Sequence, residues 1–509
     1  MIRPHAPFFV AVGVVATLVG TAAAEPSSTS TSSDPTREAI RAAIANAEAN
    51  GQKTVGVFLP EAPSALPHAA ISTVMYMNRC TGGCVINGGT ADDSRTFTSQ
   101  IPNAGTHPMG EFQEGGMTGA AADDAWNELV ACVKEVYSPY GVQVTDQPPT
   151  AAAYHMAIVA GLPEDIGLSS NTGGVAISTC APRENGISFT FANAEGGSGT
   201  SRMLKLCWYV AQESAHNFGL AYHAWKFTAD GRSACNDPMT YREDCGGQKF
   251  FRNGNVSCGD FSENQPACMC GPSQNSHLKL LAVFGEGTPT YGKPNAAVTL
   301  PVEGGQLGAV VGVQAGSKRG IAKLELLVNG FKWAEVTGAP FGPNGQANPS
   351  PYTIPVPSNL PGGVVELVAR AYDDLGDYAD SPVVMATKGA PCASADSCAA
   401  GQKCEAGKCF WDPPSGEIGD SCGFDQACLS GKCSPTAEDR ICTQTCAPGV
   451  MGSCPENFDC LQTSAGNFCY LPPEEGGCCS VGGGPQAVYV HGALSALVFG
   501  FLVFRRRRR

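Results

Sequence analysis

The chain has 509 residues, with 24 Cys, 62 Gly and 37 Pro, and 15% of its residues are charged. This length predicts several domains rather than one large core. Without Arg3 and Arg505–Arg509, 26 basic residues stand against 46 acidic ones, so the net charge falls from −14 to −20. An acidic surface of this size repels phosphate backbones and argues against nucleic acid as a partner.

Residues 1–24 have the pattern of a secretory signal peptide. Arg3 supplies a positive start, Phe8–Gly20 is an uncharged apolar run, and the alanines up to Ala24 form a small-residue cleavage site. The alternative is an anchor helix that is not cleaved. The prediction is that the chain is exported.

Residues 25–70 are expected to be a leader. Its first part is rich in Ser, and a short helix is then predicted from Thr36 to Asn50, with Ile40 and Ile44 on one face. This segment is either a propeptide or simply an N-terminal helix. It contains no Cys that could cap a metal.

Residues 71–286 are predicted to form one α/β domain. The expected elements are a strand at 71–77, a helix at 124–137, strands at 142–144, 155–159, 175–178 and 187–191, and a helix at 203–220.

Residues 296–388 are predicted to form an all-β sandwich. Apolar residues alternate from Leu324 to Val328, Asn329-Gly330 is a strong hairpin turn, and Val365–Ala371 is a second alternating strand. The pattern resembles bacterial Ig-like domains of secreted proteins. The Asp-rich stretch Asp373–Asp377 is interpreted as a turn, with a calcium site as the alternative.

The cysteines divide the chain into blocks. Ten lie before residue 290, none in 291–391, twelve from Cys392 to Cys469, and two at Cys478-Cys479. Even counts and export predict disulfides within each block. Residues 390–475 are therefore expected to be a disulfide-stapled stalk, and they contain no His that would favour zinc.

The C-terminal tail, 478–509, is predicted to contain a transmembrane helix at 487–504, because 18 uncharged residues precede Arg505–Arg509. Together with Cys478-Cys479, this tail resembles the sorting tails of myxobacterial surface proteins. The resemblance implies a processing enzyme as partner and delivery to the cell surface or the medium. A plain membrane anchor is the alternative.

The chemical signal lies on the second long helix, in the stretch Gln212–His223. Two metal ligands four residues apart face the same side of a helix, and a Glu beside the first can reach a zinc-bound water. A Gly one turn later lets the chain turn back and supply a third ligand. Zinc lowers the pKa of its bound water to about 7, so that the Glu can take the proton.

This stretch resembles the metzincin metallopeptidases, whose motif is H-E-x-x-H-x-x-G-x-x-H followed by a Met-turn. The resemblance implies that Glu213 is the general base and His216 a zinc ligand. It also implies that Gly219 makes the turn, Met239 is the Met-turn residue and Tyr241 assists catalysis.

The motif is incomplete at two positions. Gln212 stands where the first His belongs, and His223 comes one residue late because Tyr222 occupies the third-ligand position. The loop after Gly219 could absorb this shift, so His223 is still expected to be a metal ligand beside His216. Gln212 would then be a weak neutral ligand. His155 or His277 could instead complete the site, or Glu213 and His216 could simply hydrogen-bond to each other in a scaffold without metal.

The fold class expected from the sequence is multidomain: an α/β metzincin-like domain, an all-β Ig-like sandwich, a small disulfide-rich region and one transmembrane helix. The expected function is hydrolysis of peptide bonds at the cell surface by a zinc-activated water. The alternative is a catalytically inactive, peptidase-like protein that binds an extracellular protein partner.

Overall fold

The computed structural model describes residues 35–49, 53–58, 72–150, 153–220, 237–240, 247–256, 268, 270–338, 349–435, 439–449, 452–463 and 466–471. They belong to two compact units. The first extends to Val328 and includes Lys332–Pro357 and Glu366–Ala386, and the second comprises Asn329–Phe331, Ser358–Val365 and the chain from Thr387 onward.

The first unit contains a six-stranded sheet in the order β1-β8-β9-β7-β2-β6. Its strands are β1 (Thr54–Phe58), β2 (Val74–Asn78), β6 (Gln143–Thr145), β7 (His155–Val159), β8 (Gly174–Ser178) and β9 (Ile187–Thr190). Parallel pairing joins β6, β2, β7 and β9, whereas β8 is antiparallel to β9 and β1 is parallel to β8. Every residue of β7, β8 and β9 is buried, as expected for strands covered on both faces.

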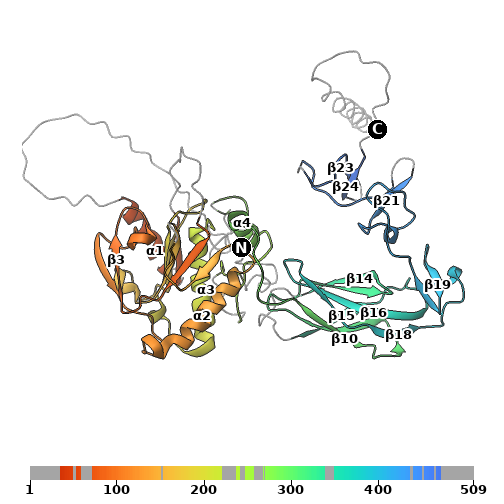
Figure 1. The fold of residues 1–509 in the computed structure, drawn as a ribbon, viewed down its shortest axis with the longest axis horizontal. Helices are drawn as coiled ribbons and strands as arrows, with labels where there is room; N and C mark the ends of the chain where they lie inside the picture. Colours follow the sequence, from red (N-terminus) through yellow and green to blue (C-terminus); the bar gives the residue numbers. More distant parts are fainter. Residues whose placement is uncertain are drawn as a thin grey trace, which may run out of the picture. The chain divides into compact units, whose positions relative to one another are not determined.

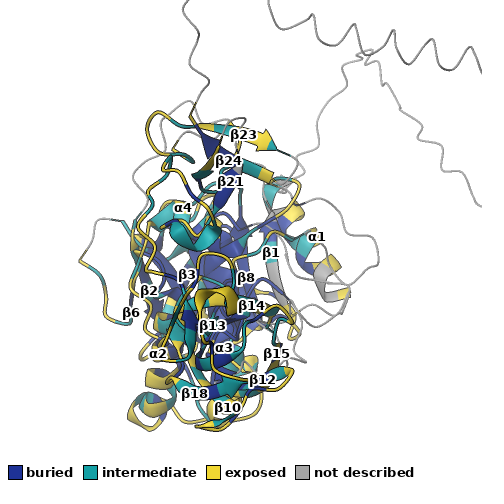
Figure 2. Cartoon of the chain, turned by 90° about the vertical axis from the view of Figure 1, so that its right-hand side faces the viewer, coloured by how far each residue is buried: buried dark blue, intermediate teal, exposed yellow. Residues whose placement is uncertain are grey.

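Helices cover both faces of this sheet. α2 (Asp123–Tyr137) and α3 (Gly199–Asn217) pack against Met75 and Ala157 on one face. α1 (Pro35–Ala49) buries Ile40 and Ile44 on the other face, next to residues of β8. Figure 1 draws this part of the chain with α1, α2 and α3 labelled. In Figure 2 dark blue marks the buried residues, which are seen around β8. The helices expected at 36–50, 124–137 and 203–220 are confirmed, apart from their exact ends.

Smaller elements complete this part of the chain. A three-stranded sheet has the order β4-β3-β5, and α4 starts where the Asn275 side chain accepts a hydrogen bond from the backbone N of Leu278. The bounds are β3 (Cys84–Gly88), β4 (Thr98–Ser99), β5 (Gly105–Met109) and α4 (Ser276–Phe284). Disulfides join Cys80 to Cys84, Cys132 of α2 to Cys207 of α3, and Cys180 to Cys270.

An all-β module follows. One sheet has the order β10-β12-β15, and the other has the order β11-β18-β16-β13-β14, with β17 paired to β16. The bounds are β10 (Asn295–Leu300), β11 (Gly305–Gln306), β12 (Val310–Gly316), β13 (Lys323–Val328), β14 (Phe331–Thr337), β15 (Ser350–Pro355), β16 (Gly363–Tyr372), β17 (Tyr378–Asp380) and β18 (Val384–Lys388). Buried residues alternate along the whole of β16, which confirms the period-2 pattern expected there.

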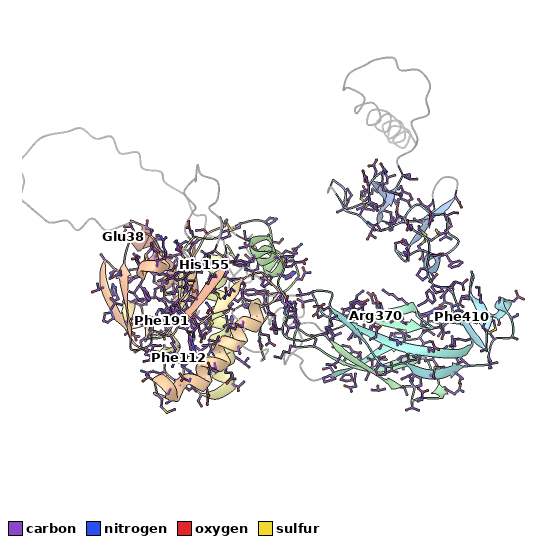
Figure 3. All side chains as sticks on the ribbon, in the orientation of Figure 1. Glu38, Phe112, His155, Phe191, Arg370 and Phe410 are labelled. Carbon is purple, nitrogen blue, oxygen red and sulfur yellow. A yellow bond between two sulfur atoms is a disulfide. The ribbon has the colours of Figure 1, made fainter. Side chains whose placement is uncertain are left out.

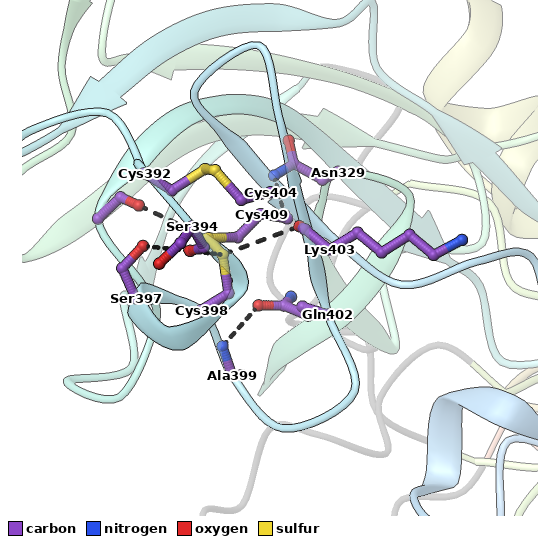
Figure 4. Close-up of a disulfide and its surroundings, with 11 residues drawn as sticks. Asn329, Cys392, Ser394, Ser397, Cys398, Ala399, Gln402, Lys403, Cys404 and Cys409 are labelled. Carbon is purple, nitrogen blue, oxygen red and sulfur yellow. Dashed lines mark hydrogen bonds between the residues drawn. A yellow bond between two sulfur atoms is a disulfide. The ribbon is translucent and has the colours of Figure 1, made fainter.

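The Cys-rich segment consists of three successive units with two disulfides each. In each unit the first cysteine pairs with the third and the second with the fourth (Cys392–Cys404 and Cys398–Cys409; Cys422–Cys433 and Cys428–Cys442; Cys446–Cys460 and Cys454–Cys469). Figure 4 shows the first of these Cys units, where Asn329 donates a hydrogen bond to the carbonyl of Cys409. The expected disulfides are therefore confirmed, and their connectivity repeats.

Each Cys unit contains a short hairpin. The strands are β19 (Lys403–Glu405), β20 (Lys408–Phe410), β21 (Cys433–Pro435), β22 (Arg440–Cys442), β23 (Asp459–Thr463) and β24 (Gly466–Tyr470). Short 3-10 helices across the chain are η1 (Ser94–Thr96), η2 (Gly119–Ala122), η3 (Pro163–Ile166), η4 (Ala192–Ala194), η5 (Ala395–Ser397) and η6 (Asp425–Ala427).

The expected fold class is wrong. The described residues are mostly β, with 24 strands against four α-helices, so a metzincin-like α/β fold class does not describe them. Long helical periodicity in α2 and α3 dominated the sequence signal, whereas short strands such as β3–β5 carry little pattern. No helix among the described residues is long and apolar enough to cross a membrane. The predicted span at 487–504, the signal peptide and the sorting tail lie outside the described residues.

A buried charge cluster joins the all-β module to the rest of the first unit. Arg319 Nε and Nη2 lie 2.7 and 2.8 Å from the two carboxylate oxygens of Asp374, and Arg252 Nη1 lies 3.4 Å from the same carboxylate. Both arginines are fully buried. Arg319 also donates to the carbonyl of Phe251 at 2.8 Å. Asp374 thus compensates two buried cations that come from distant parts of the chain.

The neighbouring Asp373 has a different role. Its Oδ1 accepts hydrogen bonds from the backbone N of Leu375 and of Asp377, at 2.9 and 3.1 Å. The predicted turn is therefore confirmed. Asp373 and Asp374 are used for this turn and for the ion pairs, and nothing in these contacts favours the calcium alternative.

We expect Asp374→Ala to lower the free energy of unfolding of the first unit by about 3–5 kcal/mol, because it leaves Arg319 and Arg252 buried without their carboxylate. The matched control is Asp380→Ala. Asp380 makes a similar two-bond pair with Arg370 but is 41% exposed, so the cost should stay below about 1 kcal/mol. Urea unfolding followed by Trp fluorescence measures both, and equal losses would contradict the interpretation of the cluster.

Burial raises the pKa of Asp373 from 3.8 to about 6. The folded protein then binds this proton more tightly than the unfolded chain, so the stabilisation is complete below pH 3.8 and is lost as the pH rises through about 6. Asp373→Asn should remove this dependence. Relative to the variant, the parent should lose up to about 3 kcal/mol between pH 4 and pH 7. Urea titrations of both chains at several pH values measure the difference, and a constant difference would refute the assignment.

Candidate functional site

The expected catalytic stretch lies at the C-terminal end of α3. Gln212, Glu213 and His216 are all on this helix, and each is fully buried. Gln212 and His216 are four residues apart and share one face, as the sequence predicts. His223 and Tyr241, the other two residues of the predicted site, lie outside the described residues.

Three glycines bring the edge of the sheet very close to α3. A Cβ added to Gly173 would lie 2.9 Å from the ring of Tyr209, and one added to Gly174 would lie 2.9 Å from Cγ of Glu213. A Cβ on Gly56 of β1 would lie 2.8 Å from Nδ1 of His216 and closer still to two other ring atoms. The helix residues are spaced by four and three positions, so one face of α3 rests on this glycine row.

The orientation of His216 is fixed by the backbone. Its Nδ1 lies 2.8 Å from the carbonyl oxygen of Leu220, which can only accept, so Nδ1 carries the proton. Burial lowers the pKa of His216 to about 4, with the Leu220 hydrogen bond acting in the opposite direction. His216 is therefore neutral at pH 7, and its Nε2 is the basic nitrogen, on the side of Gly56.

The residues predicted to form the Met-turn, Asp237–Thr240, lie in a turn that packs against α3. Thr240 N bonds to the carbonyl of Asp237, and Met239 is fully buried in the same cluster as Ala211 and Ala215 of α3. The side chain of Asp237 accepts from the backbone N of Met239 at 2.8 Å. Trp208 of α3 donates to the carbonyl of Pro238 at 2.7 Å, which ties the turn to the helix.

The two alternative ligands are used elsewhere. His155 (labelled in Figure 3) packs edge-on against Phe218 at 4.6 Å, and neither ring nitrogen has a hydrogen-bond partner in the part of the chain that the structure covers. Burial lowers its pKa to about 3, so it is a neutral core residue. His277 of α4 bonds to the hydroxyl of Tyr140 at 3.2 Å.

These residues do not by themselves make a zinc site. Of Gln212, Glu213 and His216, only His216 is an imidazole, and Gln212 offers a neutral amide. Within the described ranges, the groups of three or more His, Cys, Asp or Glu close enough to hold a metal are all cysteine groups. Those cysteines are paired in disulfides, which argues against metal there.

Sequence analysis missed the residues that lie over the site. It placed no strand in the leader, although Thr54-Val55-Gly56-Val57-Phe58 has the β-branched and aromatic composition of one. It also gave no role to Gly173 and Gly174. A glycine beside a strand of branched residues was the available signal for a close approach of another element.

No family model and no curated protein matches the chain. Among solved structures, fibronectin(III)-like modules of Clostridium thermocellum CbhA share 21% identity, with a TM-score of 0.14, over 18% of this chain and 94% of theirs. A double mutant of Cellulomonas fimi endo-beta-1,4-mannanase shares 12% identity, with a TM-score of 0.13, over 46% of this chain and 53% of its own. Likenesses this weak support no argument about fold or function, so the metzincin and sorting-tail resemblances stay predictions.

Proposed function

We propose that the first unit of this chain binds extended peptides alongside β8, in the position at the edge of the six-stranded sheet that β1 occupies (the β8 edge). The observation that carries the proposal is β1 itself. This strand comes from the leader, before residue 71, and adds to the edge in parallel register, from Thr54 opposite Gly174 to Phe58 opposite Ser178. The protein therefore already holds one extended segment, β1, alongside β8.

Edge-strand addition explains how such a site would recognise a peptide. Main-chain hydrogen bonds supply sequence-independent affinity, and the alternating side chains supply specificity. On one side, Val57 is 1% exposed and packs in the cluster that contains Val175 and Ile177 of β8. On the other side, Gly56 lies against His216. Both faces of the added strand therefore contact buried residues of the protein.

The disulfides of the chain support a location outside the cell, where such a function would act. Three disulfide-stapled units follow the all-β module, and disulfides persist in oxidising compartments. We propose that the chain acts outside the cell or at its surface, that an extracellular protein is its partner, and that a C-terminal sorting tail is processed there.

The test uses the full chain with Val57→Asp, which buries a charge in the cluster behind β1 and should release that strand. A fluorescent peptide with the sequence of Lys53–Phe58 should then bind, with an affinity at least about tenfold higher for the variant than for the parent, where β1 competes. Fluorescence anisotropy measures both dissociation constants.

The matched control is Val302→Asp, because Val302 is 69% exposed and far along the chain in the all-β module. It should leave peptide binding as in the parent. Circular dichroism confirms that the variants fold. A folded Val57→Asp chain that binds no extended peptide would overturn the proposal.

The second candidate function is zinc-dependent peptide hydrolysis. It is favoured by His216, whose Nδ1 bonds to a carbonyl as metal-binding histidines commonly do, and by Glu213 one turn before it. Such an enzyme would also depend on His223 and Tyr241, which lie outside the described residues. Glu213 is fully buried against Gly174, an arrangement that favours packing over proton transfer to a substrate.

For the parent chain we expect well below one zinc per molecule, because Gln212 is a weak neutral ligand. Gln212→His should raise zinc content, and His216→Ala in that background should abolish the gain. Elemental analysis after dialysis measures this. One zinc per parent chain, together with peptide cleavage that Glu213→Gln abolishes, would establish the hydrolase instead.

A further inference from the structure

We infer that the β8 edge selects peptides with a glycine followed by a branched apolar residue, and that Gly56-Val57 of the leader is its built-in occupant. This specificity rests on the peptide-binding function proposed above and names the kind of partner that it takes. The partner would be an extracellular polypeptide with an extended segment of this composition.

Space, rather than backbone conformation, requires the glycine. Gly56 is not among the glycines with positive φ, so any residue could adopt its backbone geometry. A Cβ at this position would nevertheless enter the imidazole ring of His216. The residue in register with Ala176 must therefore lack a side chain.

His216 cannot easily move aside. The ring is fully buried, its Nδ1 is bonded to Leu220, and its backbone belongs to a helix of 19 residues. The same helix is held to α2 by the Cys132–Cys207 disulfide. Displacing the ring would break the hydrogen bond and disturb a packed core, which destabilises the fold.

The next position requires an apolar side chain. Val57 is opposite Ile177, and its side chain is almost completely buried among Ile40, Ile44 and Val175. A polar residue there would be buried without water. Because alternate residues of a strand face opposite sides, glycine and the apolar residue must be neighbours in sequence.

β1 can exchange without loss of the whole leader. α1 packs on β1 but is also held by contacts elsewhere, since Arg41 donates to the carbonyl of Gly167 and to the side chain of Asn103, at 3.1 and 2.9 Å. A peptide that replaces β1 would still find Ile40 and Ile44 in place. The leader strand and an external peptide therefore compete for one edge.

The first test is a double-mutant cycle in the intact chain. Gly56→Ala should lower the melting temperature and increase hydrogen exchange in residues 53–58. Adding His216→Ala should restore protection there, because the clash is gone. The control Gly196→Ala has open space around its Cβ and no positive φ, and should change neither quantity. Equal effects of Gly56→Ala with and without His216 would overturn the inference.

The second test compares two peptides on the full-length Val57→Asp chain. The peptide Lys-Thr-Val-Gly-Val-Phe should bind at least about tenfold more tightly than its Gly→Ala analogue, and His216→Ala should remove that preference. Equal binding of both peptides would refute the selectivity but leave the peptide-binding function intact. If neither peptide binds, the proposed function itself fails, whereas the cycle in the intact chain still tests the contact between Gly56 and His216.

Discussion

The contact between α3 and a row of glycines at the sheet edge determines how this site works. Gly173, Gly174 and Gly56 have no side chains, so the helix lies directly on the backbone of β8 and β1. Because of this closeness, Glu213 and His216 are fully buried instead of lining an open cleft. Because of the same closeness, a single carbon atom added to the residue opposite Ala176 would clash with the ring of His216. The contact between α3 and the glycines thus buries one face of the helix and sets the proposed specificity of the β8 edge.

The turn that contains Met239 and the junction with the all-β module are linked through the carboxylate of Asp237. Asp237 accepts from the backbone N of Met239, in the turn under α3, and from the backbone N of Arg252 at 2.8 Å. Arg252 in turn faces Asp374 of the all-β module. Burial raises the pKa of Asp237 to about 6, so this link is also sensitive to protons. The turn next to α3 is therefore linked to the all-β module through Asp237 and Arg252.

The sequence predicted those elements whose patterns are long or chemically distinctive. The periodic apolar residues of α2, the alternation in β16 and the even cysteine blocks all correspond to observed structure. The fold class was wrong because short strands such as β4 leave almost no periodic signal. The motif around His216 predicted which residues share a helix face, but motif matching carries no information on what packs against that face. Gly56 is 160 residues away in sequence, and only the tertiary fold brings it to His216.

The central claim is that β1 occupies the β8 edge in solution, and hydrogen–deuterium exchange of the intact chain tests it most directly. The account predicts slow exchange of the backbone amides of Gly174–Ser178 and of those amides of Thr54–Phe58 that face β8, because the two strands pair and β1 is the edge strand of the sheet. If the amides of residues 54–58 exchanged as fast as those of an unfolded peptide while α3 stayed protected, β1 would not be seated. The leader would then not be the occupant of this edge.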